Sequence, residues 1–183
     1  MSDASPPPIG AHVLVASDRA ARGERPDGAA DALLAALKDL GYALPAPSVT
    51  ISPDDVSTLS GHLRRLAADP AVRFIVTTGG TGAAWRDVTP EASRAVFARE
   101  LPGFGELMRA ESLKKTVYAA GSRATAGTVG DVLIVNLPGS PKGALECLGF
   151  IAKPARHVLD LIAGAVRDCA PVRAAEDQGG PVR

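Results

Sequence analysis

The sequence has no excess of charge of either sign, and this excludes two classes of partner. Its 183 residues contain 20 Lys and Arg against 20 Asp and Glu, so the formal net charge is zero. Nucleic-acid-binding proteins carry a basic excess, and polybasic membrane anchors need clustered Lys and Arg. No apolar run approaches the length that a membrane-spanning helix requires. We therefore expect neither a nucleic acid nor a membrane as partner.

Cysteine and histidine are also scarce. Cys147 and Cys169 lie far apart, and the three histidines, His12, His62 and His157, are scattered. These counts exclude a disulfide framework, a thiolate zinc site and a His-rich metal site. Free thiols suit a reducing compartment, and the amino-terminal residues lack the basic and apolar regions of a signal peptide. We expect a cytoplasmic protein.

A hydrophobic content of 46% is enough to build a globular core. The first ten residues are rich in Pro and polar, and the last fifteen end in Gln-Gly-Gly-Pro-Val-Arg. We therefore expect a single domain over residues 11–168, a disordered tail over residues 1–10 and a flexible tail over residues 169–183.

Strand and helix patterns alternate along this domain. Short apolar runs predict strands over residues 12–16, 48–51, 74–78 and 132–135. Helical spacing or start signals predict helices over residues 29–40 and 55–68, from Thr89-Pro90, and from the turn at Pro138-Gly139 to about Gly164. Pro154 is expected to kink or break the last helix. The alternation predicts an α/β fold with three layers, a mostly parallel sheet with helices on both faces.

Polar or glycine-rich residues follow each predicted strand. In open α/β sheets, ligands bind beyond the carboxyl ends of the strands. The residues at these positions are Ser17 and Asp18, Asp54, the run Gly79-Gly80-Thr81-Gly82 with Asp87 after it, and the run from Asn136 to Lys142. If the sheet is parallel there, these loops converge on one edge and form a single site for an anionic ligand.

Two features have a clear physical logic, and each has a structural alternative. Glycines in the run 79–82 allow positive φ and let backbone N–H groups approach a phosphate, but the run also suits a tight strand-to-helix turn. Asp54 and Asp87 are candidates for Mg²⁺, which one or two carboxylates and substrate phosphates typically hold. Asp54 equally suits the N-cap of the next helix, and Asp87 suits a surface ion pair with Arg86 or Arg123.

Other polar and aromatic residues also fit two roles. Ser17 and Asp18 suit a turn as well as a ligand site. Lys142 fits a phosphate contact or a solvated side chain, and Trp85 fits stacking on a ring or packing within its loop. Cys147 is expected in the core. Helical spacing indicates packing against the sheet or a partner subunit for Phe104, Leu107, Met108 and Leu113.

Several motifs together resemble the molybdopterin-binding MogA/MoaB family. They are Thr-Thr-Gly-Gly-Thr-Gly at 77–82, Arg-Asp-Val-Thr-Pro-Glu-Ala at 86–92, Pro-Gly-Phe-Gly-Glu-Leu-Met-Arg at 102–109, Ser-Arg at 122–123 and Leu-Ile-Val-Asn-Leu-Pro-Gly at 133–139. The resemblance runs from about Val13 to Gly164. The stretch 86–92 is more similar to the MogA branch, which includes the G domain of gephyrin.

The resemblance implies a molybdopterin adenylyltransferase, which transfers AMP from ATP to molybdopterin with Mg²⁺ and releases pyrophosphate. It also implies a homotrimer and a downstream molybdenum-inserting enzyme of the MoeA type. The functionally important aspartates of the family fall on Asp54 and Asp87. The implied nucleotide and molybdopterin site comprises Ser17, Asp18, Thr78, Gly79, Gly80, Thr81, Gly82, Ser122, Asn136, Pro138, Gly139 and Lys142.

Two alternatives share the same fold, so the fold does not separate them. A MoaB-like carrier binds molybdopterin without catalysis, and a generic α/β nucleotide-binding domain binds no pterin. A carrier has no need of the pair Asp54 and Asp87, or of pyrophosphate release that depends on Mg²⁺.

Overall fold

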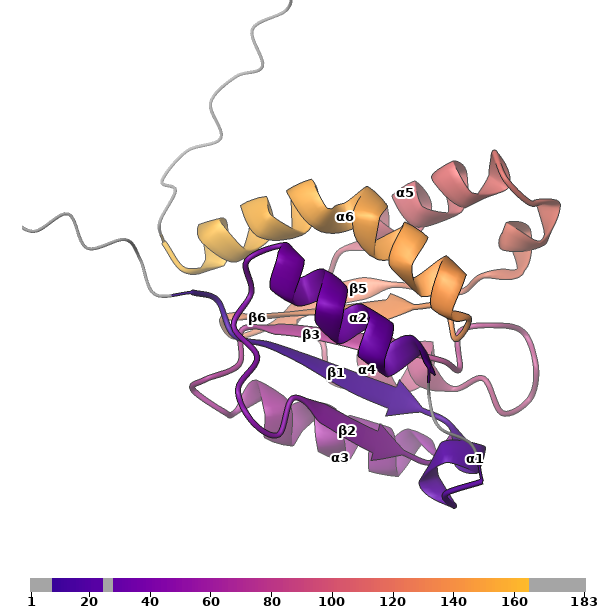
Figure 1. The fold of residues 1–183 in the computed structure, drawn as a ribbon, viewed down its shortest axis with the longest axis horizontal. Coiled ribbons are helices and arrows are strands. Elements are labelled where there is room, and N and C mark those ends of the chain that lie inside the picture. The colour runs from indigo at the N-terminus through magenta and orange to yellow at the C-terminus, as the bar shows by residue number, and fades with distance from the viewer. Residues whose placement is uncertain (1–7, 25–27, 165–183) are drawn as a thin grey trace, which may run out of the picture.

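A six-stranded sheet in the order β2-β1-β3-β6-β5-β4 forms the centre of the molecule (Figure 1). The computed structural model describes residues 8–24 and 28–164. The strands are β1 (Ala11–Ala16), β2 (Val49–Ser52), β3 (Phe74–Thr78), β4 (Arg99–Glu100), β5 (Ala126–Val129) and β6 (Val132–Leu137). The helices are α1 (Asp18–Ala21), α2 (Gly28–Asp39), α3 (Val56–Ala67), α4 (Thr89–Arg94), α5 (Pro102–Leu113), the 3₁₀ turn η1 (Val117–Gly121) and α6 (Pro141–Ile162).

Four neighbouring strands, β2, β1, β3 and β6, run parallel, and their ends are level at one edge. Ala16 pairs with Ser52, and Thr78 pairs with both Val15 and Leu137. The prediction of a mostly parallel sheet and of these four strands is confirmed. The sequence did not predict β5, which runs antiparallel to β6, or β4, which runs antiparallel to β5. Because β5 runs the other way, its first residue lies at the edge where the parallel strands end.

Helices cover both faces of the sheet (Figure 1). On one face α2, α5 and α6 bury a large apolar cluster against alternate strand residues such as Val13, Phe74 and Val135. On the other face α3 and α4 cover a smaller cluster around Ile75 and Ile134. The predicted three layers are confirmed. The burial of both faces explains why the central strands read as continuous apolar runs.

Two predicted boundaries differ from the structure. Helix α6 continues across Pro154, so the predicted break is wrong, because Ile151, Ala155 and Leu159 anchor the helix to the same apolar cluster on both sides of the proline. Gly10 already belongs to the fold, since its carbonyl accepts from Phe74 N at 3.0 Å. Residues 1–7 and the predicted tail over 169–183 lie outside the described residues. Within the described chain, no helix is long and apolar enough to cross a bilayer.

Candidate functional site

The loops after β1 and β2 are joined by a reciprocal pair of hydrogen bonds. Asp18 N donates to Asp54 Oδ2 at 3.0 Å, and Asp54 N donates to Asp18 Oδ1 at 3.0 Å. The N-cap of α3 is instead Asp55, whose carboxylate accepts from Thr58 N at 2.8 Å, so the capping alternative for Asp54 is wrong by one residue. Asp54 therefore has a role between the loops, at the carboxyl edge of the sheet.

The glycine loop after β3 takes a backbone course that other residues rarely adopt. Gly79 and Gly80 have φ of 94° and 63°, the positive values that both the phosphate-binding and the tight-turn alternatives require. A Cβ on Gly79 would lie 2.3 Å from the Ala16 carbonyl oxygen, and Gly139 comes close to Gly79 from the loop after β6. The Thr89 hydroxyl donates to Gly79 O at 2.9 Å and fixes the loop from α4. Three of the predicted loops therefore meet at Gly79.

Asp54 and Asp87 border this glycine loop. Asp54 Oδ1 lies 3.5 Å from where a Cβ on Gly80 would be, and Asp87 Oδ2 lies 2.8 Å from that of Gly82. Burial raises the pKa of Asp54, and the carboxylates of Asp18 and Asp87 raise it further. Two neighbouring carboxylates therefore add negative potential at Asp54.

The contacts of these carboxylates decide what kind of metal site they could form. Within the described residues, no group of three or more His, Cys, Asp or Glu side chains is arranged to hold a metal ion. Asp54 and Asp87 each use only Oδ2 in a hydrogen bond to the described chain, with Asp18 N and Ala84 N respectively. Two carboxylates with a free oxygen each suit Mg²⁺ that completes its shell with ligand phosphates and water. The residues fit that kind of metal site and not a closed protein cage.

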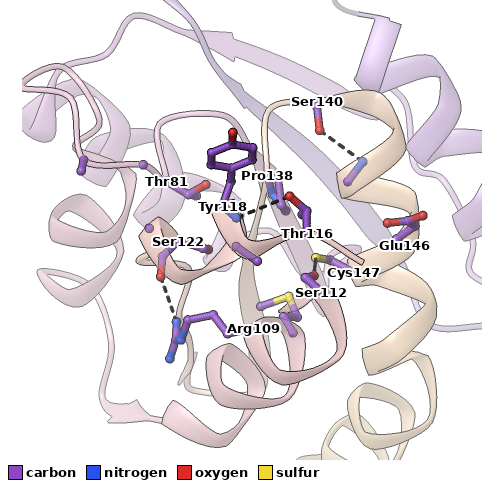
Figure 2. A pocket seen from close by; sticks show the side chains of 16 residues that line it. Thr81, Arg109, Ser112, Thr116, Tyr118, Ser122, Pro138, Ser140, Glu146 and Cys147 are labelled. Carbon is purple, nitrogen blue, oxygen red and sulfur yellow. Dashed lines mark hydrogen bonds between the residues drawn. The ribbon is translucent and has the colours of Figure 1, made fainter. Parts of the chain in front are cut away.

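A cavity of about 410 Å³ opens beside the glycine loop, between α5, η1 and the start of α6 (Figure 2). Its polar lining comes mainly from hydroxyl groups, with one arginine and one glutamate. The residues that line it are Thr81, Gly82, Ala83, Met108, Arg109, Ser112, Thr116, Tyr118, Ala119, Gly121, Ser122, Pro138, Ser140, Gly143, Glu146 and Cys147. Tyr118 stands at the cavity with 88% of its surface exposed.

Four predicted site residues line this cavity, namely Thr81, Gly82, Ser122 and Pro138. The sequence analysis missed its wall from α5, η1 and α6. The polar side chains between Arg109 and Tyr118 could have indicated this wall. They precede the antiparallel strand β5, however, and the search for site residues covered only those that follow a parallel strand. Cys147 is buried as predicted and also lines the cavity, and burial raises the pKa of its thiol.

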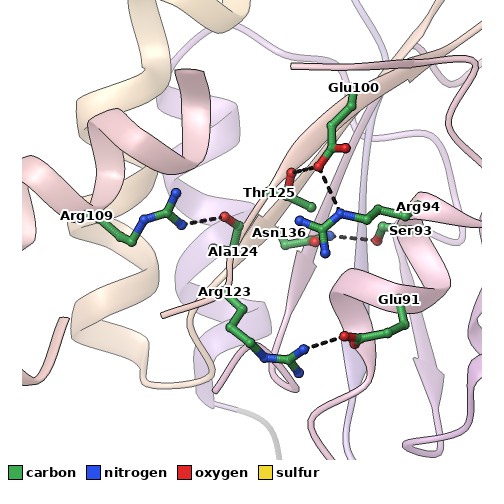
Figure 3. A network of polar contacts seen from close by, with 9 residues as sticks. All are labelled: Glu91, Ser93, Arg94, Glu100, Arg109, Arg123, Ala124, Thr125 and Asn136. Carbon is green, nitrogen blue, oxygen red and sulfur yellow. Dashed lines mark hydrogen bonds and ion pairs between the residues drawn. The ribbon is translucent and has the colours of Figure 1, made fainter. Parts of the chain in front are cut away.

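Other predicted residues support the loops from within. The Thr78 hydroxyl donates to Pro138 O at 2.9 Å and joins two of the loops. Ser17 Oγ accepts from Ala20 N at 3.2 Å and caps α1, as its turn alternative suggested. Asn136 is fully buried and donates to Thr77 Oγ1 at 3.0 Å. It also donates to Ser93 Oγ at 2.8 Å, as Figure 3 shows. Lys142 is exposed in the first turn of α6, so both of its roles stay open.

The loop between Gly82 and Asp87 bears on two alternatives. Trp85 is 85% exposed, and its ring lies 5.3 Å from the guanidinium carbon of Arg86 in the same loop, so both of its roles stay open. Arg123 binds the backbone carbonyl of Asp87, and its ion pair is with Glu91 (Figure 3). The predicted ion pair between the Asp87 carboxylate and Arg123 is therefore wrong. That carboxylate instead accepts from Ala84 N at 2.7 Å.

Known proteins resemble this chain over most of its described length. Residues 12–157 match a family described as a probable molybdopterin binding domain. A molybdopterin adenylyltransferase of Helicobacter pylori strain J99 is 40% identical over 152 residues, which cover 83% of this chain and 86% of that protein. The molybdopterin adenylyltransferase of Escherichia coli K12 is 41% identical over 135 residues, which cover 72% of this chain and 68% of that protein. In the solved structure of the molybdopterin biosynthesis enzyme MoaB from Thermus thermophilus, the identity is 41% and the TM-score 0.79, with 85% of this chain and 97% of that one covered.

Proposed function

Because the chain belongs to the molybdopterin-binding family of molybdenum-cofactor biosynthesis, we propose that it is a molybdopterin adenylyltransferase. This is the activity for which its curated relatives are named. The observation that carries the proposal is the placement of two carboxylates along a glycine loop that also forms the wall of a cavity. A carrier that only holds a ligand has no need of the carboxylates.

The reaction is a transfer of AMP. An oxygen of the terminal phosphate of molybdopterin attacks the α-phosphorus of ATP, a new P–O bond forms, and the bond to the β-phosphate breaks with pyrophosphate as leaving group. Such transfers need positioning and charge neutralisation more than covalent help from the protein. The loop from Gly79 to Gly82 would receive the phosphates through its backbone N–H groups. The sides of Gly79, Gly80 and Gly82 on which a Cβ would stand are filled by Ala16, Thr89 and Asp87. The cavity beside Thr81 and Ser122 holds the pterin.

Asp54 and Asp87 are the residues that would hold Mg²⁺. When bound, the ion neutralises the negative charge that accumulates on the phosphates during transfer. Burial raises the pKa of Asp54, and the nearby carboxylates of Asp18 and Asp87 add to that rise; a cation bound beside Asp54 would offset both effects. Asp18 keeps Asp54 in place through their two backbone hydrogen bonds.

Assembly, compartment and partner follow from the family resemblance. We propose a cytoplasmic homotrimer whose product passes to a MoeA-type molybdenum-inserting enzyme. An apolar groove of about 280 Å³ between α5 and α6, lined by Leu101, Pro102, Gly103, Phe104, Leu107 and Pro154, offers a surface for a second copy. Sedimentation equilibrium measures the mass in solution, and a monomer at micromolar concentration would contradict the trimer.

The deciding experiment measures pyrophosphate release from ATP and Mg²⁺, with and without molybdopterin. We expect release that requires molybdopterin and that falls at least about 100-fold in Asp87→Asn. Asp39→Asn is the matched control, because Asp39 is an exposed aspartate at the end of α2 and away from the carboxyl edge of the sheet. Tight molybdopterin binding without pyrophosphate release would refute the adenylyltransferase and support the carrier. No pterin binding at all would support a generic nucleotide-binding domain.

A further inference from the structure

Arg123 holds both ends of the loop that carries Asp87. Its Nε donates to Gly82 O at 2.7 Å, and its Nη2 donates to Asp87 O. Its backbone N donates to Thr81 O at 2.9 Å. Nη1 pairs with the Glu91 carboxylate in the first turn of α4 (Figure 3). One guanidinium therefore closes the loop at its base and fastens it to the next helix.

The tip of this loop has little else to hold it. Residues 83–86 are exposed. Of the hydrogen bonds that reach residues 82–87 from elsewhere in the described chain, all come from Arg123. The remaining bonds are local: Ala84 N donates to Asp87 Oδ2 at 2.7 Å, and Asp87 N donates to Ala84 O at 2.9 Å. The position of the Asp87 carboxylate thus depends on a side chain from another part of the fold.

The chemistry of this contact points to support of the loop and not to direct binding of substrate. The charge of Arg123 is already paired with Glu91, and its donors are directed at carbonyl oxygens. Because the C=O and the following N–H of a peptide unit point in opposite directions, these bonds turn the amides of Ala83 and Val88 away from Arg123. Neither amide has an acceptor among the described residues, so both remain open to an anionic group.

We propose that Arg123 is a positioning residue of the adenylyl transfer, which sets Asp87 relative to Asp54 and ties it to the wall of the molybdopterin cavity. The inference rests on the proposed function. The cavity wall is part of this connection, because Gly82 and Ser122, on either side of the Arg123 contacts, both line the cavity. A planar guanidinium reaches two carbonyls and a carboxylate at once, whereas a lysine ammonium acts as a single point charge.

The test compares Arg123→Gln and Arg123→Lys with Arg64→Gln. Arg64 is the matched control, since its Nη2 donates to Ala95 O at 2.9 Å and so links α3 to the far end of α4. Trp85, the single tryptophan of the chain, lies in the supported loop and reports on its motion without any label. Fluorescence anisotropy of Trp85, thermal unfolding, kcat, and the KM values for molybdopterin and Mg²⁺ are measured for each variant.

In both Arg123 variants we expect lower Trp85 anisotropy, a kcat lowered about 10- to 100-fold and a raised KM for Mg²⁺, with little change in the KM for molybdopterin. Arg64→Gln keeps wild-type values. Wild-type anisotropy in folded Arg123→Lys, or full kcat in that variant, would overturn the proposal; if Arg123→Gln does not fold, the lysine variant alone decides. If the wild type itself releases no pyrophosphate, the proposed function fails, and the anisotropy comparison still tests whether Arg123 holds the loop.

Discussion

Replacement of Gly79 by alanine tests how the glycine loop is built. The new side chain has two separate costs. An L-residue at φ 94° is strained by about 1–3 kcal/mol. The added Cβ would also lie 2.3 Å from the Ala16 carbonyl oxygen, and Ala16 ends the strand that pairs with both β2 and β3, so the backbone has little room to move. Forced overpacking of this kind costs about 1–3 kcal/mol more.

The expected loss of unfolding free energy is therefore about 2–6 kcal/mol, out of a total of about 5–15 kcal/mol for a typical domain. At about 2–4 °C per kcal/mol, Tm falls by about 4–24 °C. Circular dichroism with heating measures it, with Gly61→Ala as control, because Gly61 is exposed on α3, a Cβ there meets no atom within 4 Å and its φ is ordinary. That control should be neutral or more stable by up to about 1 kcal/mol. Equal Tm values for the two variants would refute the reasoning.

Three further predictions concern titrating groups. The pKa of Asp54 is raised by burial and by its acidic neighbours, so ionised Asp54 lowers stability at neutral pH. Asp54→Asn should therefore raise the free energy of unfolding at pH 7 by at most about 1 kcal/mol, seen as a higher Tm, and the difference from the wild type should close below the pKa of Asp54. A difference that widens on acidification would contradict this. Adenylyl transfer is lost in the same variant. Hydrogen bonds from Ser57 and Thr58 lower the pKa of Asp55 from 3.8 to about 2. The contribution of ionised Asp55 to stability is therefore present above pH 3.8 and is lost as the pH falls through 2. Asp55→Ala should lower Tm at pH 7 and have little effect on it at pH 2. Burial raises the pKa of the Cys147 thiol, so iodoacetamide at pH 8 should modify Cys147 more slowly than free cysteine. Because Cys147 lines the cavity, bound molybdopterin should slow the reaction further. Mass spectrometry of the modified peptide measures both rates.

The central strands were predictable because each is buried on both faces. Residues 74–78 and 132–135 read as continuous apolar or β-branched runs for that reason. Strand β5 reads as Ala-Gly-Thr-Val and carries no such signal. Its glycine is there for space, since a Cβ on Gly127 would lie 2.4 Å from the Phe97 ring. A contact with Phe97, thirty positions earlier, therefore requires glycine at residue 127, and the hydrophobic pattern of the neighbouring residues carries no sign of that contact.

The candidate site likewise contains residues that the sequence predicts and residues that it does not. Asp54, Gly79 and Asp87 follow parallel strands, so a search beyond the ends of those strands finds them. Ser122 and Arg123 precede β5, which runs the other way and reaches the same edge from the opposite direction. Only the family resemblance pointed to Ser122. The sequence offered Arg123 as an ion-pair partner of Asp87, but nothing in the local pattern indicated that Arg123 binds the backbone carbonyls of Gly82 and Asp87. The direction of a strand is a property of the whole sheet, and it decides which flank of the strand enters the site.

The reciprocal hydrogen bonds between Asp18 and Asp54 couple two positions that lie 36 residues apart in the sequence. Each aspartate accepts from the other's backbone amide, so a side chain without an acceptor oxygen at one position leaves the amide at the other without its partner. The consequence of a substitution at residue 18 therefore depends on what occupies residue 54, and the two effects do not add. A side chain that keeps an acceptor oxygen, such as asparagine, can replace either aspartate without loss of these two bonds, whereas alanine at either position removes one of them.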